Sequence, residues 1–231
     1  MNISVIIPSY NEEKNLIQLI PELKKYLTLT DTDFEIITVD AIASRDNTEK
    51  ICEENEITYV RQKKRGYADA FRTGISLAKN ELLLVVDADN CQDISKIPEM
   101  YKAMLDGADV VIGSRYTKGG KTADSRLNII MSKLLNTAYS LVLGLKQRDI
   151  STDFRMYDIK KLKSINTECE NFDVIEEALF LLQKKFPDIV IKEIPISYKK
   201  RIEGNSKRRL LTFIKGYIKL LFKLMRLKKR G

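Results

Sequence analysis

Residues 82–89 read Leu82-Leu83-Leu84-Val85-Val86-Asp87-Ala88-Asp89, an unbroken apolar run that ends in two aspartates. Apolar runs without alternation are typical of strands buried on both faces, as in a parallel sheet covered by helices. The two carboxylates are spaced i and i+2, so both can face one hard cation and the oxygens around it. Aspartates in this place also cap helices, and the triplet alone leaves both roles open.

Strand-like and helical segments alternate on either side of this run. Strands are predicted at Ile3–Ile7, Phe34–Val39, Ile57–Val60, Leu82–Val86 and Val110–Gly113, with a helix carrying Leu16 to Leu27 after the first strand and further helices near 47–55, 67–79 and 94–106. The alternation predicts an α/β fold with a Rossmann-like, mostly parallel sheet covered by helices on both faces. Ligands of such open sheets bind at the carboxyl ends of the strands. The polar residues found there are the candidates for a site: Ser9 to Glu12, Asp40, Asp87, Asp89, Ser114 and Arg115.

The pattern is looser beyond residue 120. It predicts helices near 126–145 and 173–185, an irregular stretch Arg148–Tyr157, a strand Ile189–Tyr198, a loop at 201–206 and a last helix to about Lys229. Lysines recur in that last helix every four residues, at 215, 219 and 223, opposite apolar residues. Such an amphipathic basic helix is the type that lies in a membrane interface. A helix docked on the domain with a solvated lysine face is an equal alternative. We therefore expect a domain at 1–207 and a C-terminal helix at 208–231.

Composition excludes several classes of site. The 231 residues contain no histidine, which rules out a Ser-His-Asp triad, a Cys-His pair and a His-ligated zinc. The three cysteines, Cys52, Cys91 and Cys169, are far apart, so we expect free thiols and a cytoplasmic location. The longest uncharged apolar stretch, Leu134 to Leu145, is shorter than the ~20 residues that span a bilayer.

The positive charge is concentrated at the C-terminus. Residues 199–231 carry 13 of the 40 basic residues and one of the 32 acidic ones, so residues 1–198 have a net charge of −4. A tail of this kind would meet nucleic acid, anionic lipid or a phosphorylated substrate. Its aromatic residues, Phe213, Tyr217 and Phe222, lie on the apolar face and away from the lysines, which argues against stacking on nucleic acid.

Two further segments suit the approach of a diphosphate: Lys63–Gly66 before a helix that carries Gly74, and Gly113-Ser114-Arg115 after a strand. Small residues permit close backbone approach, and an arginine fork matches phosphate oxygens. Neither segment fits GxxxxGK[ST] or GxGxxG, so P-loop and dinucleotide sites are excluded.

Taken together, the motifs resemble a known family. Ile6–Glu12, Val39-Asp40, the Asp87 to Asp89 triplet and the segment 66–74 resemble the nucleotide-sugar domain of family 2 glycosyltransferases, which have the GT-A fold. Three later motifs are similar to the dolichyl-phosphate mannose synthase branch: Asp109–Tyr116, Asp149–Arg155, and Glu193–Ile196 with Arg201, Gly204, Ser206 and Lys207. The resemblance covers residues 1 to about 210.

The resemblance implies a reaction and a set of site residues. The reaction is an inverting transfer of mannose or glucose from GDP-mannose or UDP-glucose to a polyprenyl (dolichyl) phosphate, at the inner face of the cell membrane. Mg²⁺ or Mn²⁺ would be held by Asp87 and Asp89. Asp89, Arg115 and Arg201 would be catalytic, and Arg115 and Arg126 would contact the acceptor phosphate. The implied donor-binding residues are Pro8, Tyr10, Glu12, Val39, Asp40, Asp87, Ala88, Asp89, Arg115, Arg201 and Lys207. A phosphate acceptor arrives as an anion and needs no strong base, which suits a chain without histidine.

The sequence departs from the family pattern at three positions. Ala41 stands where a second aspartate is usual, Cys91 where a glutamine is expected, with Gln92 beside it, and Asp153 where glycine is usual. The nucleobase and the third metal contact are therefore open.

Two other functions stay open as alternatives. A glycolipid or cell-surface saccharide acceptor would need a carboxylate base such as Asp153 or Glu176. A basic nucleic-acid- or nucleotide-binding module without transferase activity is the alternative of another class. The basic helix is the expected link to lipid, and the sequence leaves open whether a membrane-anchoring subunit recruits the chain.

Overall fold

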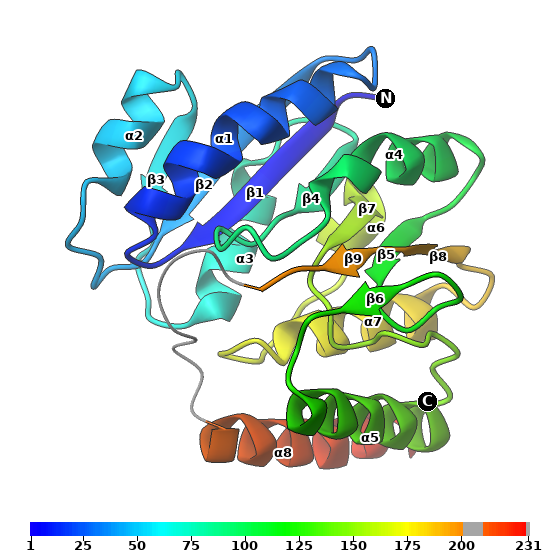
Figure 1. Cartoon of the computed structure of the whole chain (residues 1–231). Coiled ribbons are helices and arrows are strands. Elements are labelled where there is room, and N and C mark those ends of the chain that lie inside the picture. Colours follow the sequence, from blue (N-terminus) through cyan, green and yellow to red (C-terminus); the bar gives the residue numbers. More distant parts are fainter. Residues whose placement is uncertain (201–209, 230–231) are drawn as a thin grey trace.

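The computed structural model describes residues 1–200 and the helix 210–229, with the side chains of that helix from 219 to 228. Within these residues, seven strands form one sheet in the order β3-β2-β1-β4-β7-β5-β8 (Figure 1). Only β7 in this sheet runs antiparallel to its neighbours, β4 and β5. The bounds are β1 (Ile3–Ser9), β2 (Phe34–Asp40), β3 (Thr58–Arg61), β4 (Leu82–Val85), β5 (Val110–Ser114), β7 (Arg155–Asp158) and β8 (Ile191–Pro195). The predicted mostly parallel sheet is confirmed.

Helices cover both faces of the sheet. Successive side chains of each strand point to opposite faces, so the apolar residues of one strand belong to two cores. Ile3, Val5 and Ile7 of β1 pack in one core with α1 (Glu13–Thr28) and α4 (Ile97–Leu105). Ile6 packs in the other core with α3 (Tyr67–Leu77) and α7 (Val174–Lys185). The remaining elements are α2 (Thr48–Glu54), the 3-10 turn Ile94–Lys96, α5 (Arg126–Leu143), α6 (Ile159–Lys163), α8 (Leu210–Lys229) and the short parallel pair β6 (Lys121–Thr122) and β9 (Ser197–Tyr198). All three cysteines are free, as predicted, and the structure shows that all three are buried.

The prediction of an irregular stretch at Arg148–Tyr157 is confirmed up to Phe154 and wrong from Arg155 on, where β7 begins. Arg155 pairs with Val85 of β4 and Ile112 of β5, in the middle of the sheet. Its guanidinium is fully buried and donates to the main-chain oxygens of Ile150 and Ile175. Because β7 has only four residues and begins with an arginine, its sequence lacks the apolar pattern that indicates a buried strand. Since β7 is antiparallel, it begins at the edge where its neighbours end, and it brings Asp153 to that edge.

Helix α8 lies beside α5 and α7 and is docked on the domain (Figure 1). Leu220 and Leu224 are buried in the same core as α7. Lys219 is exposed, but the Nζ of Lys223 lies 2.7 Å from Glu177 Oε1 and 2.9 Å from Glu168 Oε2. Burial lowers the pKa of Lys223, but the hydrogen bonds that its ammonium donates to the two glutamates outweigh burial and raise the pKa overall. The predicted lysine stripe is therefore wrong at Lys223, which anchors the helix instead of facing outward.

Candidate functional site

The polar residues that follow the parallel strands meet at one edge of the sheet, as the sequence predicts. Ser9 of β1 lies beside Asp40 of β2, and Ile6 of β1 lies beside Val85 of β4. The turns that leave these strands carry Tyr10, Glu12, Asp87 and Asp89. Asp87 and Asp89 are partly exposed, whereas Ala88 between them is buried. The two carboxylates are therefore accessible on a turn whose middle is fixed by packing.

This turn, residues 87–92, is held from several sides. The Cys91 N–H donates to Asp89 Oδ1 at 3.1 Å, and Asn90 has a left-handed backbone with φ +60°. Asn90 Nδ2 donates to the main-chain oxygen of Asn15 in α1 at 2.9 Å, and the Lys199 N–H donates to that of Cys91 at 2.7 Å. Helix α1 and the segment after β9 thus set the position of the two aspartates.

Asp40 forms a second part of the site. Its carboxylate accepts from the Tyr59 hydroxyl at 3.1 Å and from the Ala41 N–H at 3.0 Å, and Arg61 Nη2 lies 4.0 Å away. Burial raises the pKa of Asp40, although hydrogen bonds from Ser44 and Tyr59 oppose it. The side chain of Arg61 is 48% exposed. Tyr59 and Arg61 are not among the predicted site residues, although Arg61 ends the third strand and obeys the same rule as Asp40.

The other residues predicted around the donor lie at this edge with different exposure. Tyr10 is 41% exposed, and Pro8 is partly exposed. Glu12 is buried and accepts from Asn15 Nδ2 at 2.6 Å. The side chain of Val39 is fully buried in the core, so only its main chain can reach a ligand.

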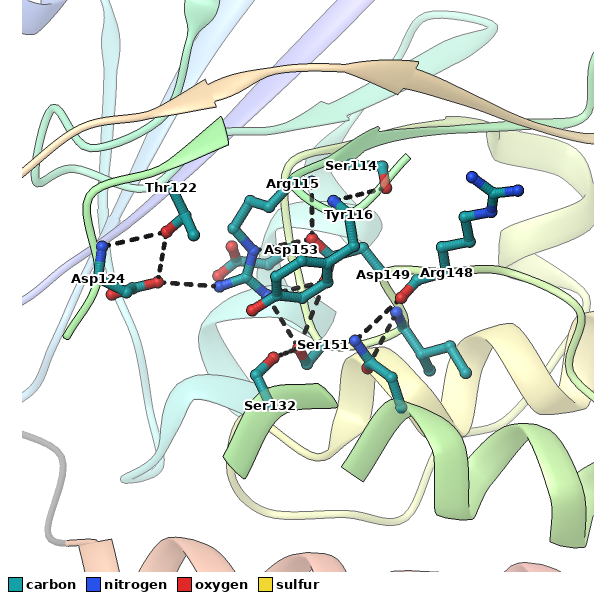
Figure 2. Close-up of polar contacts among 12 residues, drawn as sticks. Ser114, Arg115, Tyr116, Thr122, Asp124, Ser132, Arg148, Asp149, Ser151 and Asp153 are labelled. Carbon is teal, nitrogen blue, oxygen red and sulfur yellow. Dashed lines mark hydrogen bonds and ion pairs between the residues drawn. The ribbon is translucent and has the colours of Figure 1, made fainter. Parts of the chain in front are cut away.

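Arg115, directly after β5, is the centre of a polar cluster (Figure 2). Its Nε and Nη2 donate to the two oxygens of the Asp149 carboxylate at 2.8 and 2.7 Å, a bidentate ion pair. Nη2 also donates to Ser151 Oγ at 2.9 Å, while Nη1 contacts Asp124 Oδ2 at 3.5 Å. The donors of Nε and Nη2 are thus committed within the protein, and Nη1 is the part of the guanidinium left to meet an anion.

The surroundings of Arg115 keep it charged. Its guanidinium carbon lies 5.0 Å from the ring centre of Tyr116 and 5.5 Å from that of Tyr198. Burial alone would lower the pKa of Arg115, but Asp149 outweighs burial and raises it. Asp149 is itself fully buried, and its N–H donates to Glu193 Oε1 at 3.1 Å.

Three other predicted cations are placed differently. Arg126 is exposed at the first residue of α5, directly after the N-cap Ser125. It lies two residues from Asp124, which contacts Arg115. Arg201 and Lys207 lie outside the described residues.

Asp87 and Asp89 fit a divalent cation that a ligand completes. Mg²⁺ is usually held by one or two carboxylates together with substrate phosphates. Within residues 1–200 and the described part of α8, no three Asp, Glu, Cys or His side chains form a group that could hold a metal unaided. The two aspartates also affect the neighbouring Tyr198. Burial is the largest cause of the raised pKa of Tyr198, and the negative charges of Asp89 and Asp87 raise this pKa further. This donor set suits a cation bound together with a diphosphate.

Comparisons with known proteins find relatives over most of the chain. The sequence model for glycosyl transferase family 2 matches residues 4–165. A dolichol-phosphate mannosyltransferase of Pyrococcus furiosus is 29% identical over 98% of this chain, which spans 64% of that relative's length. A dolichyl-phosphate hexose transferase of Haloferax volcanii is 26% identical over 87% of this chain and 84% of its own.

A solved structure shares the fold. Glucosyl-3-phosphoglycerate synthase from Mycobacterium tuberculosis, solved with Mn²⁺, uridine diphosphate and glucosyl-3-phosphoglycerate, superimposes with a TM-score of 0.74 at 16% identity. The match covers 98% of this chain and 79% of the synthase. The expected GT-A fold is confirmed.

Proposed function

The chain belongs to glycosyl transferase family 2, and from this we propose that it transfers a hexose, mannose or glucose, from a nucleotide sugar to a polyprenyl phosphate. The observation that carries the proposal is the pair Asp87 and Asp89, accessible after β4 at the edge shared with Asp40 and Arg115. The activities named for the two relatives, dolichol-phosphate mannosyltransferase and dolichyl-phosphate hexose transferase, support the acceptor class. GDP-mannose and UDP-glucose are the proposed donors.

Asp87 and Asp89 would hold Mg²⁺ or Mn²⁺, which when bound neutralises the diphosphate leaving group. The nucleoside would lie between Tyr10 and the Asp40 end of β2, where Arg61 is exposed. Nη1 of Arg115 faces the phosphates in this proposal, with Arg126, Arg201 and Lys207 as further phosphate contacts. The residues act by positioning and by stabilising charge.

The acceptor is proposed to be an anion, because the carboxylates named as bases are engaged or buried. Asp153 is buried, and both of its oxygens accept hydrogen bonds, from Gln92 and Tyr67. Glu176 is fully buried in α7. A hydroxyl acceptor, as on a glycolipid or saccharide, needs a base at the reacting oxygen. A lipid phosphate needs none, and this favours the polyprenyl phosphate.

Attachment to the membrane is proposed to involve α5 as well as α8. Four large apolar side chains of α5 are exposed on the side opposite its buried residues: Leu127 (58%), Ile130 (56%), Leu134 (60%) and Leu141 (79%). On the neighbouring α8, Phe222 is 60% exposed between the exposed cations Lys219 and Arg226. Exposed apolar rows next to cations suit an anionic lipid surface. No helix in the described part of the chain is long and apolar enough to cross a bilayer. A peripheral position at the inner face of the membrane follows as a proposal.

Charges on the α5 row test this attachment. Leu134→Glu with Leu141→Glu is expected to weaken binding to vesicles of anionic phospholipid by about tenfold or more, since each buried leucine contributes about 1.5–3 kcal/mol. Co-sedimentation with vesicles measures it. The matched control is Leu29→Glu with Leu105→Glu, two leucines of similar exposure at the ends of α1 and α4. Equal binding of the two double variants would contradict a role of α5.

A transfer assay tests the proposed reaction. The purified chain is incubated with Mn²⁺ or Mg²⁺, a short polyprenyl phosphate in detergent and a pool of GDP-mannose, UDP-glucose and UDP-N-acetylglucosamine, and the lipid is weighed by mass spectrometry. We expect a hexosyl lipid that is lost when a chelator removes the metal. Binding of a nucleotide sugar without any lipid product would contradict the acceptor class.

A further inference from the structure

A buried hydrogen-bonded bridge joins the turn of Asp87 and Asp89 to the start of β7. Asp153 Oδ1 accepts from Gln92 Nε2 at 2.9 Å. Gln92 Oε1 in turn accepts from the main-chain N–H of Asp87 at 3.0 Å. Both side chains are buried, with 7% and 4% of their surface exposed. The bridge therefore runs from a carboxylate, through one amide group, to the backbone of the first metal-binding candidate.

The chemistry of the bridge fixes which way the amide of Gln92 points. A carboxylate can only accept, so it must face the amide nitrogen, and the Asp87 N–H can only donate, so it must face the amide oxygen. Every partner is satisfied, and a satisfied buried polar network defines one geometry.

The carboxylate of Asp153 is fixed from its other side by Tyr67. The Tyr67 hydroxyl donates to Asp153 Oδ2 at 3.0 Å, and its ring stacks on Phe172 with 4.2 Å between ring centres. Gly66, just before Tyr67, has φ +103°, and a Cβ there would collide with the main-chain oxygen of Glu170. Only glycine fits this entry to α3, so the place of the Tyr67 ring is set by the backbone.

We propose that Asp153 is a positioning residue: through Gln92 it fixes the main chain at Asp87 and so keeps Asp87 and Asp89 in place for a divalent cation and a nucleoside diphosphate. The inference rests on the proposed function, which puts these ligands at the two carboxylates. Asp153 does not touch the substrate in this role. The alternative with a hydroxyl acceptor gives Asp153 the role of a general base. The positioning role takes its place.

An exchange of donor and acceptor tests the bridge. Asp153→Asn places an amide N–H₂ group against the Gln92 amide or the Tyr67 hydroxyl, the two groups that donate to Asp153. Gln92→Glu brings two carboxylates together. The double variant keeps the net charge and restores the bond in reverse, because the new amide at position 153 donates to the new carboxylate at position 92. The second oxygen at position 92 still accepts from the Asp87 N–H, and the oxygen at position 153 still accepts from Tyr67.

Binding of UDP and of GDP at increasing Mn²⁺, measured by calorimetry without acceptor, is the readout. Partners that orient metal ligands contribute about 10–100-fold to metal affinity. Each single variant is therefore expected to raise the midpoint, the Mn²⁺ concentration at which nucleotide binding is half-maximal, by about tenfold or more. The double variant is expected to return to within about threefold of the wild type. Tyr67→Phe, which removes the hydrogen bond to Asp153 and keeps the stacked ring, is expected to raise the midpoint by about threefold. This variant keeps the test decisive if a single variant at position 92 or 153 does not fold.

The outcomes separate this inference from the proposed function. Wild-type protein that binds neither nucleotide with Mn²⁺ would contradict the proposed function. Wild-type binding with unchanged midpoints in the variants, or a double variant weaker than both singles, would overturn the positioning role alone. Transfer activity restored in the double variant would in addition contradict Asp153 as a base, since no carboxylate remains at position 153.

Discussion

Asp89→Asn is expected to lower the rate of hexosyl transfer by about a thousandfold or more while the protein stays folded. The substitution removes one of two charges that hold the cation, and a cation at a leaving group contributes several kcal/mol, each 1.36 kcal/mol being a factor of about ten. The fold should survive because Asp89 is partly exposed and the amide oxygen of asparagine can still accept from the Cys91 N–H. Initial rates at saturating Mn²⁺ and donor, together with thermal unfolding, measure both effects.

A matched control for this variant lies in the same segment. Asp93 is also a partly exposed aspartate, but its carboxylate accepts from the Ser95 hydroxyl at 2.6 Å and the Ser197 N–H at 3.1 Å. Asp93→Asn keeps an acceptor for one of these groups and is expected to change the rate by less than about threefold. Near-normal activity of Asp89→Asn would contradict the metal assignment.

Asp149→Ala is expected to lower the free energy of unfolding by about 3–5 kcal/mol, because it leaves the buried charge of Arg115 without its bidentate partner. Asp149 also accepts from the Arg115 N–H at 2.9 Å, so one carboxylate satisfies three donors of the same residue. For a chain of this size the melting temperature should fall by about 2–4 °C per kcal/mol. Urea unfolding followed by circular dichroism gives the free energy directly.

Asp124→Ala is the control for that variant. Asp124 contacts Arg115 at 3.5 Å and its side chain is 24% exposed, so its loss is expected to cost less than about 1 kcal/mol. A free energy of unfolding of Asp149→Ala within about 1 kcal/mol of the wild-type value would contradict this account. It would show that the buried charge of Arg115 does not need Asp149 as its partner and that its guanidinium can turn entirely toward a ligand.

Local patterns were enough to predict the parallel part of the fold and the edge that carries the site. Leu82–Val86 contains no polar residue, so its burial on both faces could be predicted, and the aspartates that follow could be placed at the carboxyl end. β7 could not be predicted in the same way. The Nη1 and Nη2 groups of its buried Arg155 donate to main-chain oxygens of Ile175 and Ile150, and nothing local marks those partners.

The contacts that shape the site join residues far apart in the chain. Gln92 and Asp153, which join at the site, are 61 residues apart, and Lys223 and Glu177, which anchor α8, are 46 apart. The spacing of Lys215, Lys219 and Lys223 indicates a helix face, but the direction of that face depends on which neighbour covers it. The exposed row on α5 has the same ambiguity, because apolar residues spaced three and four apart are typical of a buried face.

The state of the acceptor phosphorus tests the proposed reaction most directly. Phosphorus NMR of a short polyprenyl phosphate, incubated with the chain, Mn²⁺ and the nucleotide sugar, follows the bond that is proposed to form. We expect the phosphomonoester signal to convert to a phosphodiester as nucleoside diphosphate is released, and to stay unchanged with Asp89→Asn or a chelator. Release of nucleoside diphosphate with the lipid signal unchanged would show that the sugar goes to water or a hydroxyl, and would contradict transfer to a lipid phosphate.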